Sequence, residues 1–219
     1  ALVSTVIGDG DWVTAVNYAF ANNIKVNPDP STYDPDALNF LASANDDYIE
    51  SAKELIKSQK EGWTVPLKEV KDGKLTGKSI NKKVDGCATW TPGDKMVFDA
   101  LTGFTDVAST REFNNQMATT VIVLKQWAEK NKETVNNILK ASYLASNQVK
   151  QYEGWKRKAA ESVAKTFNME DADYWYNMFK GQKGEKNGIS YNMGGSRVFN
   201  LADANQYYGI TDGTNPHNA

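Results

Sequence analysis

Hydrophobic and polar positions along this chain predict strands that are followed by helices. A run of small and apolar residues, Val84 to Ala88, breaks at Thr91-Pro92-Gly93-Asp94, and apolar residues at helical spacing then continue to a closing Gly103. Proline disfavours a helical residue before it and fits the first position of a helix. We therefore expect an extended Thr91, with Pro92 opening a helix.

The start of the chain repeats this organisation. Leu2 to Ile7 is a β-rich run that predicts a buried strand, and apolar residues at helical spacing follow the loop Gly8-Asp9-Gly10-Asp11-Trp12. The glycines allow a tight turn, and Asp11 is expected to cap the helix. If the two strands are parallel neighbours, both loops lie at one edge of the sheet, where open α/β sheets bind ligands. The candidate ligand-binding residues are Asp9, Gly10, Asp11, Trp12, Thr89, Trp90, Thr91 and Asp94.

The remaining elements follow from the same patterns. Further strands are expected at Leu38–Ser43, Phe104–Ser109 and Thr119–Leu124. Further helices are expected from Asp46 or Asp47 to about Ile56, and at Lys125–Lys150, Tyr152–Phe167, Asp171–Phe179 and Val198–Tyr208. Loops are expected at Lys25–Asp36, Thr110–Ala118 and Gly181–Gly195, and a linker-like tail at Thr211–Ala219.

The segment between Gln59 and Lys83 predicts a β-hairpin that turns at Asp72-Gly73. It holds seven lysines against three acids from Lys60 onward. Lysines commonly protect an exposed edge strand from pairing, which is the simpler interpretation. The alternative is a docking surface for an acidic partner or a neighbouring subunit. In either case we expect the hairpin to lie on a rim and to carry little of the core.

The amino-acid composition argues against several classes of protein. The 219 residues are 40% hydrophobic and 24% charged, as in soluble globular proteins, and the net charge of −2 predicts no nucleic-acid partner. Cys87 is the single cysteine, so no internal disulfide framework exists, and its place in a strand favours a buried, inert thiol. The sequence has no signal peptide pattern and no apolar run of membrane-spanning length.

Catalytic and metal motifs are largely excluded. The single histidine, His217, stands in the tail, which excludes a Ser-His-Asp or Cys-His arrangement and a zinc site with nitrogen or sulfur ligands. No phosphate-binding loop or dinucleotide fingerprint is present. Carboxylate chemistry by Asp9, Asp11 and Asp94 stays open as the minor alternative. We expect no enzyme activity, no cofactor and no metal.

Two stretches carry a resemblance to a known family. They are the region from Leu38 to Trp90-Thr91-Pro92, and the strand and helix from Thr120 to Val135, which include Trp127-Ala128-Glu129-Lys130-Asn131 and Glu133-Thr134-Val135. Together they resemble the nitrate-, sulfonate- and taurine-type solute-binding proteins of ABC transporters, a subgroup of which is fused to an OmpA-like domain. The likeness extends to Asp173-Tyr174-Trp175-Tyr176 and to Gly194–Asp203. The hairpin is a departure, because the family usually has a short turn there.

The resemblance implies an α/β, type II periplasmic-binding-protein-like fold with two lobes. Residues 1–103 would form lobe two with the inserted hairpin 60–83, residues 104–118 the crossover, and residues 119–210 the C-terminal part of lobe one. The implied function is to bind a small polar solute in an interlobe cleft and to present it to a membrane ABC permease, in the periplasm or cell envelope. The alternative is a structural or adhesive envelope protein that reuses the fold without binding a solute.

Two further expectations concern the ligand and the chain itself. The carboxylates beside Trp12 and Trp90 favour an amine or a heteroaromatic cation over an inorganic anion. The chain begins inside an apolar run at Ala1 and lacks the family's N-terminal part of lobe one, so we expect it to be a fragment of a longer envelope protein.

Overall fold

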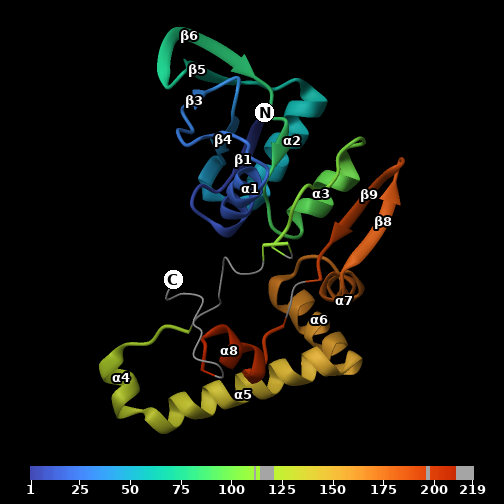
Figure 1. Cartoon of the computed structure of the whole chain (residues 1–219). Helices are drawn as coiled ribbons and strands as arrows, with labels where there is room; N and C mark the ends of the chain where they lie inside the picture. Colours follow the sequence, from blue (N-terminus) through green and yellow to red (C-terminus); the bar gives the residue numbers. More distant parts are fainter. Residues whose placement is uncertain (111, 114–120, 196–197, 211–219) are drawn as a thin grey trace. The chain divides into compact units, whose positions relative to one another are not determined.

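The computed structural model describes residues 1–110, 112–113, 121–195 and 198–210 (Figure 1). The chain forms two compact units. The first comprises Ala1–Ala118 and Lys183–Met193, and the second comprises Thr119–Gln182 and Gly194–Ala219. None of the helices in the described ranges is both long enough and apolar enough to cross a membrane.

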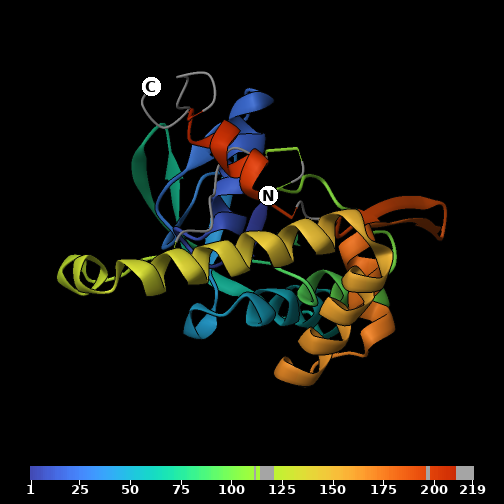
Figure 2. The ribbon, with the colours of Figure 1, turned by 90° about the horizontal axis from the view of Figure 1, so that it is seen from below.

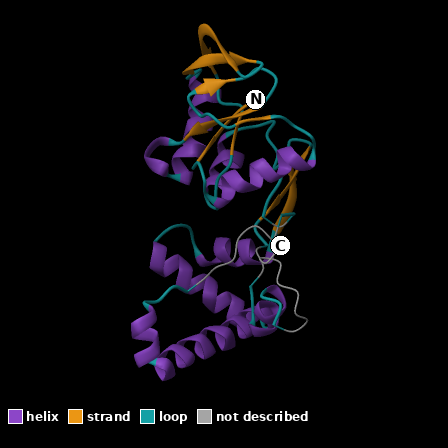
Figure 3. Cartoon of the chain, turned by 60° about the vertical axis from the view of Figure 1, so that its left-hand side comes forward, coloured by secondary structure: helices purple, strands orange, loops and turns teal. Residues whose placement is uncertain are grey.

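A four-stranded parallel sheet forms the centre of the first unit, in the order β2-β4-β1-β7 (Figure 3). Its strands are β1 (Leu2–Thr5), β2 (Val26–Asn27), β4 (Leu38–Ala42) and β7 (Gly86–Cys87). β1 pairs in parallel with both β4 and β7, with Val3 opposite Phe40 on one side and Gly86 on the other. The α/β class is therefore confirmed, and the two strands predicted to be neighbours are neighbours.

Helices α1 (Gly10–Ala21) and α2 (Tyr48–Glu61) cover opposite faces of this sheet. Successive side chains of a strand point to opposite faces. Ser4 faces α2, because its Oγ donates a hydrogen bond to Glu54 on that helix. Phe40 lies in register with Val3 on the other face, where its ring meets Trp12 of α1 edge-on at 6.0 Å. The sheet is therefore buried on both sides, as parallel sheets require.

The main hydrophobic core lies on the α2 face and includes α3 (Gly93–Ala100). Leu2 and Leu55 are completely or almost completely buried there, at 0% and 1% exposure. The buried members of this core are Leu2, Tyr33, Ala52, Leu55, Leu67, Val84, Val97 and Leu101. A short 3-10 helix, Ala44–Asp46, follows β4, and Asp47 then caps α2 by accepting a hydrogen bond from Ile49 N at 2.7 Å.

The predicted hairpin is present as β5 (Val65–Lys71) and β6 (Lys74–Lys82), which form a second sheet with β3 (Thr32–Tyr33). Its turn residues Asp72 and Gly73 both have positive φ, at 51° and 74°, as a two-residue hairpin turn requires. Leu67 is only 5% exposed and belongs to the main core. The expectation that the hairpin carries little core is therefore wrong at its base. An acidic partner for its lysines stays a prediction.

A second hairpin replaces the loop predicted at 181–195. It consists of β8 (Gln182–Lys186) and β9 (Ile189–Met193) and turns at Asn187-Gly188, which again have positive φ. Within the first unit, Tyr191 packs on Phe98 of α3 with the ring centroids 5.4 Å apart. Asn-Gly is the strongest short-range hairpin signal, so the sequence held the information for this correction.

The second unit is helical and consists of α4 (Lys125–Lys130), α5 (Lys132–Gln151), α6 (Glu153–Phe167), α7 (Ala172–Lys180) and α8 (Leu201–Tyr207). Figure 2 shows α6 turning away from the end of the long α5. The single helix predicted at 125–150 is interrupted at Asn131, where φ is −124° and ψ is 37°. The helices predicted at 152–167 and 171–179 are confirmed within one residue at each end.

Two predicted strands do not form where the structure describes them. Residues 104–109 and 121–124 are irregular, and Ile122 is 88% exposed. Residues 119–120 of the second prediction lie outside the described ranges, as do most of the 110–118 connection and the whole tail 211–219 with His217. β-propensity reflects packing against neighbouring strands, and a β-branched run without such neighbours gains nothing from extension into a strand.

Candidate functional site

The carboxyl ends of three parallel strands meet at one edge of the central sheet. The loops that follow β1, β4 and β7 all leave from this edge, since β1 is hydrogen-bonded in parallel to both other strands. Thr5 closes β1, and its carbonyl accepts a hydrogen bond from Ser43 N at 2.8 Å. We call this region, with residues 5–12, 43–47 and 87–94, the carboxyl edge. It holds all eight candidate ligand-binding residues.

The first loop places Asp9 and Gly10 at the start of α1. Asp9 is the capping residue, and its Oδ1 accepts a hydrogen bond from Gly10 N at 2.7 Å. The expectation that Asp11 caps the helix is therefore wrong. The helix begins at Gly10, two residues earlier than a cap at Asp11 requires, so Asp11 falls inside the first turn.

Asp11 is buried at the carboxyl edge with only 8% of its surface exposed. Its Oδ1 accepts a hydrogen bond from Trp12 N at 2.8 Å. Burial raises the pKa of this carboxyl from 3.8 to about 6, and the nearby charge of Asp9 adds to the increase. The Thr5 hydroxyl lies close enough to lower the pKa somewhat, yet Asp11 Oδ2 and Thr5 Oγ1 each lack a hydrogen-bond partner of ordinary geometry.

The two tryptophans occupy different environments. Trp12 packs on Phe40 and is partly buried, so one ring surface is part of the fold. Trp90 is 41% exposed in the loop before α3. Trp90 is therefore more accessible to a ligand than Trp12.

In the second loop, which follows β7, the polar side chains mainly make hydrogen bonds that fix the loop in place. Thr89 donates a hydrogen bond to Tyr48 O at 2.7 Å, and Thr91 donates to Asp94 Oδ2 at 2.9 Å. Burial raises the pKa of Asp94, while its hydrogen bonds from Thr91 and Lys95 N lower it. The Thr91-Pro92 peptide is cis, and Pro92 stands just before α3 rather than as its first residue.

Carboxylates from both loops act on the thiol of Cys87. Burial raises the pKa of its thiol to about 12, with further contributions from the negative charges of Asp94 and Asp11. Both carboxylates therefore lie near the end of β7. The thiol stays protonated at neutral pH, as an inert cysteine does, but Cys87 is half-buried rather than buried as predicted.

Sequence reasoning missed three polar residues of the carboxyl edge. Thr5 and Ser43 are 0% and 5% exposed; the Thr5 hydroxyl acts on the Asp11 carboxyl, and Ser43 Oγ has no hydrogen-bond partner in the described part of the chain. Glu54 of α2 accepts hydrogen bonds from Ser4 Oγ and from Ala44 N, the latter at 3.1 Å. The available signal was a hydroxyl residue at the end of each apolar strand, a position that parallel sheets present to ligands.

Gly93 is required by the packing of the second loop. A Cβ at this position would lie 2.1 Å from Thr89 Oγ1. Thr89 is β-branched and its hydroxyl is held by Tyr48 O, so it cannot easily give way. We expect Gly93→Ala to destabilise the protein by about 1 to 3 kcal/mol in urea denaturation.

The matched control for that change is Gly154→Ala. Gly154 lies in α6, and a Cβ there would meet nothing within 4 Å, so alanine is expected to stabilise by about 0.5 to 1 kcal/mol. Equal effects of the two substitutions would contradict the tight contact between Gly93 and Thr89.

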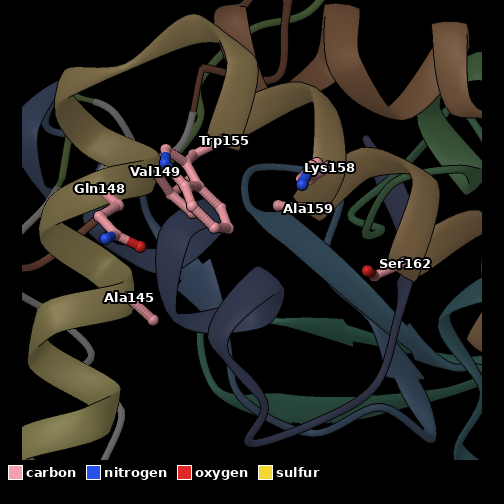
Figure 4. Close-up of a pocket in the computed structure, with 7 residues that line it drawn as sticks. All are labelled: Ala145, Gln148, Val149, Trp155, Lys158, Ala159 and Ser162. Carbon is pink, nitrogen blue, oxygen red and sulfur yellow. The ribbon is translucent and has the colours of Figure 1, made fainter.

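A groove of about 190 Å³ lies in the second unit between α5 and α6 (Figure 4). It is lined by Ala145, Gln148, Val149, Trp155, Lys158, Ala159 and Ser162. None of the eight candidate residues lines it. Figure 4 shows the Trp155 ring between the two helices, with small side chains opening the space beside it.

Comparison with known proteins adds no family. No protein-family model, no curated protein and no solved structure matches this chain. Among the described residues, no group of three or more His, Cys, Asp or Glu side chains is placed to hold a metal ion. Any function must therefore be argued from the geometry of the carboxyl edge.

Proposed function

We propose that this chain binds a small polar solute at the carboxyl edge, as the solute-binding component of an ABC-type uptake system. The observation that carries the proposal is the parallel pairing of β1 with both β4 and β7, which brings three strand-to-helix loops together. In open α/β sheets, such an edge is where ligands bind. The loops supply carboxylates, hydroxyls and an exposed tryptophan, which are groups that recognise polar solutes.

The proposal includes the finer features implied by the resemblance. These are a type II binding-protein fold with two lobes, a location in the periplasm or cell envelope, and a membrane ABC permease as partner. Closure of two lobes around the solute would create the form that the permease recognises. The buried carboxylate of Asp11 and the half-buried carboxylate of Asp94 set the charge of the site.

A thermal-shift panel tests whether any solute binds. Anions, amines, amino acids and sugars are added singly to the purified chain at pH 7.5. A solute at 100 times its dissociation constant is expected to stabilise the fold by about 2.7 kcal/mol. If no solute class raises the melting temperature, the proposal fails and a structural or adhesive envelope role takes its place.

A further inference from the structure

The β5–β6 hairpin carries an excess of positive charge that the rest of the chain does not share. Residues 60–83 hold seven lysines and three acidic residues, a net charge of +4, while the whole chain has a net charge of −2, so the remaining residues together carry −6. β6 is the outer strand of its sheet, because the described strands lie in the order β3-β5-β6 (Figure 1). A basic edge strand therefore belongs to an otherwise acidic protein.

Three lysines at and near the turn of this hairpin have no acidic partner. Lys71, Lys74 and Lys78 are all exposed, and we call them the tip lysines. Within the described part of the chain none of them forms an ion pair, and this includes pairs with Glu69 and Asp72 of the same hairpin. Their positive charges are therefore available to a partner.

Two of the tip lysines lie directly opposite each other. Lys71 on β5 is the register partner of Lys74 on β6. Directly opposite side chains share one face of an antiparallel pair, and like charges at such positions destabilise the sheet. Edge protection explains single lysines on β6, but it does not require a second lysine opposite. In the next pair, Val70 and Leu75, the leucine is 61% exposed, so the tip presents unpaired cations beside an apolar side chain.

We propose that the tip of the β5–β6 hairpin binds an acidic segment of a partner protein, whose carboxylates pair with the tip lysines and whose apolar side chain contacts Leu75. Complementary charge steers such a segment to the hairpin and gives specificity. A membrane surface or a nucleic acid presents negative charge over a wide area, which repels the acidic remainder of this chain. A short segment contacts the hairpin alone. The inference does not depend on solute binding at the carboxyl edge.

The binding test uses a fluorescein-labelled peptide in which glutamates flank a single leucine. Its fluorescence anisotropy is followed as the whole chain is added, in about 0.02 M and in about 0.3 M NaCl. The peptide is expected to bind at low salt and to bind at least about 10-fold more weakly at high salt, because exposed charges are screened. The same peptide with glutamine in place of every glutamate is expected not to bind.

A pair of triple variants locates the binding on the hairpin. Glutamine in place of all three tip lysines is expected to weaken the peptide by about 10-fold, because each exposed charge pair contributes modestly. The matched control changes the net charge equally on the second unit, and its binding is expected to change by less than about 2-fold. It substitutes glutamine for three exposed helical lysines that form no ion pair with described residues, Lys132, Lys140 and Lys165.

Lys74→Glu separates binding from folding. It replaces the like-charge pair with an opposite-charge pair across the strands, so the urea midpoint of unfolding is expected to rise. The same change reverses one charge of the binding surface, so the peptide is expected to bind at least about 10-fold more weakly. A variant that is more stable and binds the peptide as wild type does would overturn the inference.

Each other outcome overturns the inference in a distinguishable way. Equal losses in the two triple variants would show that binding follows net charge and not the hairpin. Binding of phosphatidylglycerol vesicles or of a DNA duplex, without binding of the peptide, would assign the hairpin to a lipid surface or to a nucleic acid. Self-association that the tip lysines support, again without peptide binding, would assign it to a second copy of this chain. If nothing binds the wild-type protein, the lysines only protect the edge strand.

Discussion

Replacing Asp11 with asparagine is expected to stabilise the empty protein at pH 7.5. The folded-state pKa of Asp11, about 6, lies above the ordinary value of 3.8, so the folded state binds the proton more tightly than the unfolded state. This carboxyl therefore costs nothing below about pH 4, and its cost grows between pH 4 and 6. Above pH 6 the cost is complete, at about 3 kcal/mol for a shift of this size.

The pH dependence separates this effect from a change in packing. Asparagine keeps the acceptor for Trp12 N, and its amide has Thr5 Oγ1 as a nearby acceptor. The gain in unfolding free energy is expected to fall by about 2 kcal/mol when urea denaturation is repeated at pH 4. The side chains that act on Asp11 are Asp9 and Thr5, and the wild-type protein measured at both pH values is the reference. Destabilisation by Asp11→Asn at pH 7.5 would contradict a buried, uncompensated charge.

Truncation of Phe40 to alanine is expected to have the largest effect on the fold. Phe40 is 2% exposed on the α1 face of the central sheet, and its ring supports Trp12. Removing a buried phenylalanine ring costs about 3 to 5 kcal/mol in unfolding free energy. Trp12 follows Asp11 directly, so loss of this support is also expected to weaken solute binding by the protein that remains folded.

Leu55→Ala provides the matched comparison on the other face. Leu55 is 1% exposed in the α2 core, and its truncation is expected to cost about 2 to 5 kcal/mol while solute affinity is kept. Urea denaturation and calorimetry of both variants check the pair. If Phe40→Ala leaves solute affinity unchanged, the packing of Trp12 on Phe40 does not position the first loop.

The parallel sheet could be predicted because its strands are short apolar runs bounded by strong signals. Val84 to Ala88 ends at a proline, and Leu2 to Ile7 ends at glycines, so each run had a clear boundary. The predicted strands at 104–109 and 119–124 did not end at such a clear boundary. Their β-branched residues satisfy a local preference, but strand formation depends on a partner strand that sequence periodicity does not reveal. The Asn187-Gly188 turn was the reverse case, a readable hairpin signal inside a segment that was expected to be a loop.

The location of the candidate site could be predicted from the sequence, but the role of each residue in it could not. Topology alone placed Asp9, Asp11 and Asp94 at one edge once β1 and β7 were neighbours. Which carboxylate is an ordinary cap and which is left unpaired depends on helix starts that shift by a residue or two. Asp9 proved to be the cap, and Asp11 a buried carboxylate whose Oδ1 accepts a hydrogen bond from Trp12 N. Thr5 and Ser43 were missed although each is a hydroxyl residue at the end of an apolar strand, which is a readable signal.

The location of a bound solute tests the central claim most directly. A crystal structure of the chain with the solute of highest affinity from the thermal-shift panel is expected to show that solute at the carboxyl ends of β1, β4 and β7. Solute density in the α5–α6 groove beside Trp155, with none at the carboxyl edge, would contradict the account.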